Sequence, residues 1–82
     1  MRGKTRDGIR LATIARMVSE LAMVGIREGT NHPMILMADG LRPCPLAESS
    51  DVRRMISPWL RDATGYSARD IYSSLKSGAW YC

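Results

Sequence analysis

The chain has 82 residues and carries 12 Lys and Arg against 8 Asp and Glu, a formal net charge of +4. A chain of this length forms one domain, and its 45% hydrophobic content with a low net charge excludes a disordered chain. The longest uncharged stretch, residues 29–38, is too short to span a bilayer, and the basic start resembles no signal peptide. We therefore expect a small cytoplasmic domain with no membrane segment.

The first expected element is a helix from Ile9, preceded by a polar, basic N-terminal tail over residues 1–8. Apolar residues recur three and four positions apart, which is the period of one helix face. The members of this stripe are Leu11, Ile14, Ala15, Val18, Leu21 and Ala22. Gly25 is then placed to end the helix in a left-handed conformation.

Two or three short strands are expected next. Residues 26–28 suit an edge strand, and the apolar run 33–38 has no helical alternation and ends at the turn pair Asp39-Gly40. Residues 41–46 contain two prolines, which cannot donate to a sheet ladder, so a strand there lies at an edge or is broken.

Two helices complete the chain. Residues 49–51 offer N-cap oxygens for a second helix, which Pro58 interrupts. The helix either ends near Ile56 and restarts with Pro58 in its first turn, or kinks there. Ser67 followed by Asp70 forms a capping-box pattern that predicts a third helix.

The segment Gly29-Thr30-Asn31-His32-Pro33 holds the only histidine of the chain. Its imidazole can exchange a proton near neutral pH, and the side chains of Thr30 and Asn31 add hydrogen-bonding groups beside it. Gly29 allows an unusual backbone conformation or the close approach of a ligand. The segment is therefore a candidate catalytic loop, with a histidine that has no task as the alternative.

Taken in chain order, residues 14–65 resemble the HicA family of toxin–antitoxin toxins, small proteins that cleave messenger RNA. In that family a helix leads into a strand, a Gly-Ser/Thr-x-His element, an apolar strand, a turn, a third strand ending in Pro, and a helix. The stretches that carry the resemblance are 21–26, 29–32, 34–36, 39–40, 42–45 and 52–56. The order of these short pieces, rather than any single one, makes the resemblance specific.

The resemblance implies an α+β fold of the double-stranded-RNA-binding-domain type over residues 9–65. In it a three-stranded antiparallel sheet packs on helices in the order αβββα, and residues 66–82 add a C-terminal helical extension. It also implies that His32 is catalytic, that RNA is the substrate and that an antitoxin protein is a partner. Neither a metal ion nor another cofactor is expected.

Cleavage of RNA without a metal ion needs a base and cations. The neighbouring 2′-OH of RNA can attack the phosphate once a base takes its proton, and Arg suits the charge that develops on the phosphate. Arg27 and Arg42 flank the His element in sequence and lie on the strands expected to sit beside it, although Arg27 is equally consistent with a solvated strand residue. The residues expected to contact RNA phosphates are Arg27, Thr30, Asn31, Arg42, Arg53 and Arg54.

The two cysteines, Cys44 and Cys82, are expected to be reduced and structural. A disulfide between them is the alternative. Two thiols and one histidine do not make a zinc site at a familiar spacing. A cysteine nucleophile would need His32 as its base.

Other functions stay open because the chain departs from the family at Pro33, at Pro58 and in its added C-terminal helix. One is a non-catalytic nucleic-acid-binding module that uses the cations Arg2, Lys4, Arg6, Arg10, Arg53, Arg54 and Arg61. Another is a small phage or mobile-element protein that binds a host protein through its C-terminal aromatic residues. These aromatic residues are Tyr66, Tyr72, Trp80 and Tyr81.

A helix-turn-helix DNA reader over 51–64 and 67–77 ranks lower. Its second helix carries only Arg69 and Lys76 as basic residues, which is few for a recognition helix.

Overall fold

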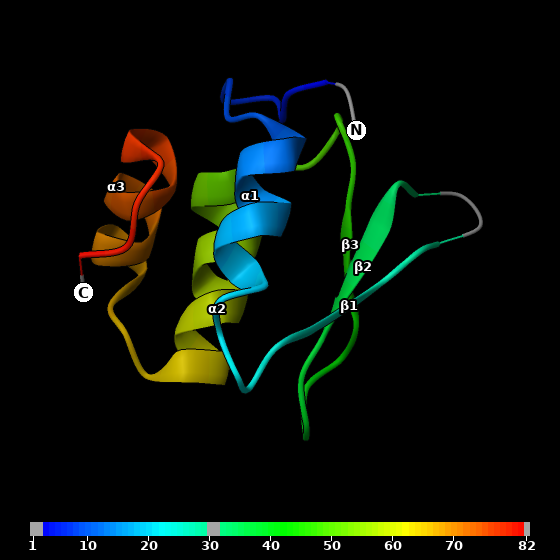
Figure 1. Cartoon of the computed structure of the whole chain (residues 1–82), viewed down its shortest axis with the longest axis vertical. Coiled ribbons are helices and arrows are strands. Elements are labelled where there is room, and N and C mark those ends of the chain that lie inside the picture. The colour runs from blue at the N-terminus through cyan, green and yellow to red at the C-terminus, as the bar shows by residue number, and fades with distance from the viewer. Residues whose placement is uncertain (1–2, 30–31, 82) are drawn as a thin grey trace.

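The computed structural model describes residues 3–29 and 32–81 and confirms an α+β fold, with the helices on one side of a three-stranded sheet (Figure 1). The elements are α1 (Leu11–Val18), β1 (Gly25–Arg27), β2 (Met34–Met37), β3 (Cys44–Leu46), η1 (Val52–Ile56), α2 (Ser57–Thr64) and α3 (Ala68–Ser77). The element η1 is a π-helical segment that runs directly into α2. The predicted order αβββα with an additional C-terminal helix is therefore correct.

The sheet is antiparallel in the order β1-β2-β3, so β1 and β3 are its edges. In its register Leu36 pairs with Ile26 on one side and with Cys44 on the other, while Ile35 pairs with Arg27 and Pro45. Because side chains alternate along a strand, one sheet face is buried and the other is partly open to solvent. The buried face carries Met34, Leu36, Cys44 and Leu46.

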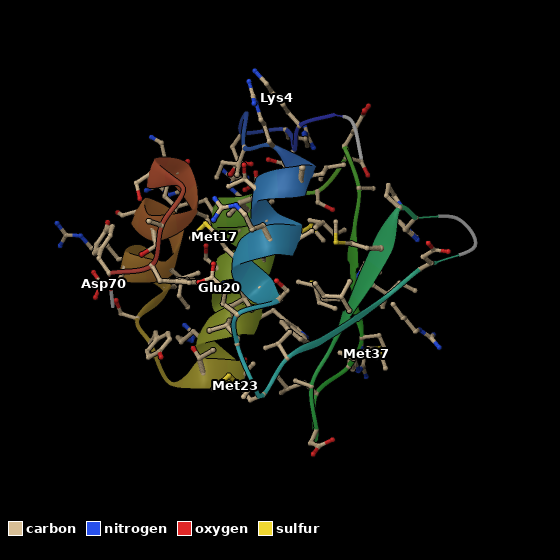
Figure 2. The ribbon with its side chains drawn as sticks, viewed as in Figure 1. Lys4, Met17, Glu20, Met23, Met37 and Asp70 are labelled. Carbon is tan, nitrogen blue, oxygen red and sulfur yellow. The ribbon has the colours of Figure 1, made fainter. Side chains whose placement is uncertain are left out.

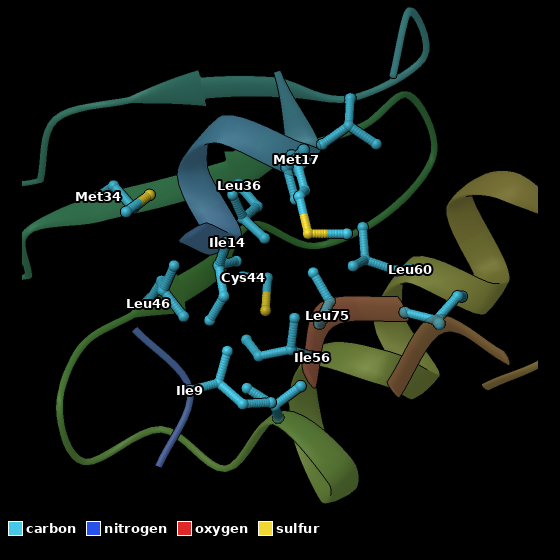
Figure 3. Packing of buried hydrophobic residues seen from close by; sticks show 14 of the residues in the cluster. Ile9, Ile14, Met17, Met34, Leu36, Cys44, Leu46, Ile56, Leu60 and Leu75 are labelled. Atoms are coloured by element: carbon cyan, nitrogen blue, oxygen red, sulfur yellow. The ribbon is translucent and has the colours of Figure 1, made fainter. Parts of the chain in front are cut away.

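One hydrophobic core joins all the layers. It contains Ile14 and Val18 of α1, Leu36 of β2, and Ile71 and Leu75 of α3, each at most 1% exposed. Figure 3 shows Ile14 packed near Leu36 and Cys44, with Ile56 and Leu75 on the helical side. The C-terminal helix therefore shares the core of the preceding domain.

The predicted end of the first helix was wrong. The helix α1 ends at Val18, and Gly25 begins β1 without the positive φ expected of a helix-ending glycine. Between them, short backbone bonds such as Leu21 N–H to the Val18 carbonyl (2.9 Å) replace the helical ones. Leu21 stays buried through these tight turns, so the apolar spacing continues after the helix has ended.

The N-caps of η1 and α3 lie at the residues that the sequence predicts. The Asp51 side chain accepts a hydrogen bond from Arg54 N–H (2.9 Å) at the start of η1, and Pro58 lies in the first turn of α2. The Ser67 hydroxyl accepts from Asp70 N–H (3.1 Å) at the start of α3. Pro58 thus lies in a first helical turn, as one of the two expectations had it, but η1 and α2 are continuous, so the helix changes type after Ile56 and does not end there.

Residues 3–10, hereafter the N-terminal turn, pack against the start of η1. Thr5 is 5% exposed, and the Asp7 carboxylate accepts hydrogen bonds from the N–H groups of Val52 (3.1 Å) and Arg53 (3.0 Å) and from the Thr5 hydroxyl (2.7 Å). Partial burial opposes ionisation of Asp7, but these bonds outweigh it and lower the pKa of the carboxyl below its ordinary value. Asp7 therefore fastens the beginning of the chain to the helical layer.

Replacing Asp7 by Ala should lower the free energy of unfolding at neutral pH by about 1 kcal/mol, as loss of a helix cap does. The stabilisation exists above the ordinary carboxyl pKa of 3.8 and disappears as the pH falls through the lowered value. Urea unfolding of the wild type and Asp7→Ala at neutral and acidic pH should therefore show a difference that shrinks in acid. Glu28→Ala, at an exposed position, is the control, and equal stability of Asp7→Ala and the wild type at neutral pH would contradict the role of Asp7.

Candidate functional site

His32 lies in the connection between β1 and β2, two residues before β2 begins, and is half-buried. Thr30 and Asn31, predicted to contact RNA phosphates, lie outside the described residues. With the described residues, His32 makes no hydrogen bond or ion pair. Its imidazole is therefore not committed to a structural contact with that part of the chain.

Gly29 holds this connection tightly closed. A Cβ atom at this position would lie 2.8 Å from the carbonyl oxygen of His32 and 3.1 Å from Ile35 Cδ1. Distances this short cannot be accommodated without displacing backbone. The absence of a side chain at Gly29 thus allows the His32 carbonyl to approach this closely. The glycine itself was the only signal of this in the sequence.

The structure separates the two arginines that flank the His element. Arg27 pairs with Ile35, the second residue of β2, which lies three residues after His32 in the sequence. Arg42 precedes β3 beside the turn that Leu41 N–H closes onto the Ala38 carbonyl (3.2 Å). Because Cys44 pairs with Leu36, Arg42 lies beyond the end of β2 that is farther from His32. Only Arg27 is therefore near the histidine.

Arg53 and Arg54 are exposed on η1, which packs against α2 and α3. In Figure 1 the helix α3 lies on the side of the molecule away from the end of β1 and the start of β2. Through Asp7, the backbone of Arg53 is joined to the N-terminal turn. The structure therefore groups these two cations with the N-terminal turn and α3 rather than with His32.

Cys44 is a core residue of β3, and burial raises the pKa of its thiol to about 11. A thiol with such a pKa is almost wholly protonated at neutral pH, so Cys44 does not act as a nucleophile in this environment. Cys82, for which a disulfide with Cys44 was left open, lies outside the described residues. Among the residues that the structure describes, no cluster of three His, Cys, Asp or Glu side chains could hold a metal ion.

The C-terminal aromatic residues mostly pack against their own domain. The Trp80 indole N–H donates to the Met17 carbonyl (2.7 Å), and Tyr66 and Tyr72 are partly buried against the core. Tyr81 alone among them is largely exposed, at 61%. An interface for a host protein would therefore have little aromatic surface to use at this end of the chain.

Comparison with protein-family models, with curated proteins and with solved structures finds no match to this chain. Within residues 3–29 and 32–81, every helix is too short or too polar to cross a membrane.

Replacing Gly29 by Ala should destabilise the protein by about 1–3 kcal/mol, the usual cost of forcing extra atoms into a packed position. Gly25→Ala is the matched control, because a Cβ there would find its nearest neighbours in Met37 at 4.0 Å, an ordinary contact. Thermal unfolding of both variants compares them directly. Equal melting temperatures for the two variants would contradict this prediction, because they would show that a Cβ at Gly29 does not lower the stability of the protein.

Proposed function

We propose that this protein is a cytoplasmic RNA-binding protein that cleaves RNA without a metal ion, with His32 as the catalytic base, and that an antitoxin restrains it. The observation that carries the proposal is the position of the single histidine. It lies two residues before the central strand of an αβββα fold, in the order of elements that the resemblance to HicA toxins implies. Its carbonyl oxygen packs against Gly29 at a distance that leaves no room for a Cβ.

The reaction needs only groups that this site and the RNA supply. His32 takes the proton of a ribose 2′-OH, whose oxygen then attacks the adjacent phosphorus. The bond from phosphorus to the 5′-oxygen breaks, and that oxygen takes a proton from water. The hydroxide that is left takes the proton from His32, which restores the base and the water. The products are a 2′,3′-cyclic phosphate and a 5′-OH, so no oxidant, reductant or further reactant is required.

Arg27 is the cation best placed to stabilise charge on the phosphate. It is exposed on the edge strand β1 and shares the open sheet face with Ile35, whose side chain borders Gly29. A guanidinium offers paired donors that match phosphate oxygens. We therefore assign Arg27 to the scissile phosphate and place Arg42 outside the reaction centre.

His32→Ala should reduce RNA cleavage in a chelating buffer by about 10²–10⁴-fold, the usual contribution of a general base. The products of the wild type should carry 2′,3′-cyclic phosphate and 5′-OH ends, and expression of the wild type, but not of His32→Ala, should arrest growth. Circular dichroism confirms that the variant is folded. Cleavage that persists unchanged in folded His32→Ala would contradict the assignment, as would a wild type that binds RNA and never cleaves it.

Arg27→Gln and Arg42→Gln remove the same charge at opposite ends of the sheet. Loss of one donor to a developing charge costs about 10²–10³ in rate, so Arg27→Gln should lower kcat by at least tenfold. Arg42→Gln should leave kcat within about twofold, because Arg42 lies beside the turn at the end of β2 that is farther from His32. Equal effects of the two variants would mean that Arg27 acts only through the overall charge of the protein.

A further inference from the structure

A hollow of about 370 Å³ lies between the N-terminal turn and the last turn of α3, and three cations line it. They are Lys4, Arg10 and Lys76, all exposed. Lys4 and Arg10 are brought together by an isolated antiparallel bridge, and Lys76 comes from the far end of the chain. Figure 2 shows Lys4 at the end of the molecule where the N-terminal turn lies, far from Met23.

Among the described residues that line this hollow, Asp7 is the one acidic residue, and its oxygens already accept hydrogen bonds. Both accept hydrogen bonds, from Val52 N–H and Thr5 at Oδ1 and from Arg53 N–H at Oδ2. The carboxylate therefore holds the backbone in place rather than pairing with a cation of the hollow. With three cations and one carboxylate, the lining has a net positive charge.

A second hollow of about 550 Å³ continues the positive surface along α3. It is lined by Arg53 of η1 together with Arg69 and Tyr72 of α3, and its described lining includes no acidic residue. The Nζ of Lys76 lies 5.5 Å from the centroid of the Tyr72 ring, which joins the two hollows. The basic track defined by these observations consists of Lys4, Arg10, Lys76, Arg53 and Arg69.

We propose that the basic track binds the phosphate backbone of single-stranded RNA. Lysine and arginine spaced along a groove beside an aromatic ring are the groups by which proteins hold single strands without reading their sequence. Lys4 lies in the N-terminal tail, and Arg69 and Lys76 lie in the C-terminal extension, so three of the five cations come from the segments added at the ends of the HicA-like domain over residues 9–65. The inference rests on the proposed function and extends it, since it supplies an RNA contact distant from His32.

The experiment uses the full chain with His32→Ala, which prevents cleavage while binding is measured. Fluorescence anisotropy with a labelled single-stranded RNA of about 20 nucleotides is recorded over a range of salt concentrations. Neutralising five phosphates gives a slope of log K against log salt of about −3.5, and each lost contact makes the slope shallower by about 0.7. The triple variant Lys4→Gln/Arg10→Gln/Lys76→Gln should therefore shift the slope by about 2.

Arg61→Gln is the control, because Arg61 is exposed on α2, pairs with Asp62 (3.3 Å) and lines neither hollow. It should leave the slope unchanged although it removes one positive charge. A triple variant that is folded by circular dichroism and keeps the wild-type slope would overturn the proposal, as would a parent protein that does not bind the RNA. Preferential binding of the parent to phosphatidylglycerol vesicles over RNA would also overturn it, by assigning the track to a membrane surface.

Cleavage assays with His32 restored separate this proposal from the proposed function. If the protein binds RNA with the predicted salt slope but never cleaves it, the basic track is supported and the catalytic role of His32 is contradicted. If RNA cleavage depends on His32 while the triple variant binds RNA with an unchanged slope, the basic track is contradicted and the catalytic role of His32 is supported.

Discussion

Burial of one face of α1 is the constraint on which the rest of the structure depends. Ile14, Met17 and Val18 are fully buried, and α1 contacts both the sheet, at β1, and the helical layer, at α3. Complete burial of such a side chain contributes about 1.5–3 kcal/mol, and a domain of this size has few of them. With a single short helix at its centre, the fold needs elements from both ends of the chain to enclose it.

That requirement explains why the terminal segments are part of the domain. Ile71 and Leu75 bring α3 into the core, and Trp80 donates to a carbonyl of α1. At the other end Ile9 is buried, and Asp7 holds the N-terminal turn to the start of η1. With both ends fixed by apolar burial and by these hydrogen bonds, Lys4 and Arg10 lie beside Lys76 on the surface between them. The grouping of cations is thus a consequence of how a small core is closed.

The sheet contributes to the site in a different way. Its helical side is filled by the core, so its other face and its hairpin connections are the parts left for a ligand. The register places Arg27 toward the His32 end and Arg42 beyond the opposite end. A catalytic centre at His32 and a charged surface at the N-terminal turn and α3 would then occupy separate regions. Such a division suits a polymeric substrate, which can contact both.

By itself, the sequence determined the local elements and their order. Ser67 and Asp70 mark the start of α3, Pro58 marks the first turn of α2, and the apolar run before Asp39-Gly40 marks β2, because caps, prolines and turn pairs act over a few residues. The end of the first helix was predicted wrongly at Gly25. The apolar spacing continues to Leu21, which is buried in the tight turns that follow the end of α1.

Only the tertiary structure decided which distant groups meet. The bonds from Val52 and Arg53 to Asp7, the hollow shared by Lys4 and Lys76, and the separation of Arg27 from Arg42 depend on packing and strand register. These relations join residues far apart along the chain, and no local pattern of residue types encodes them.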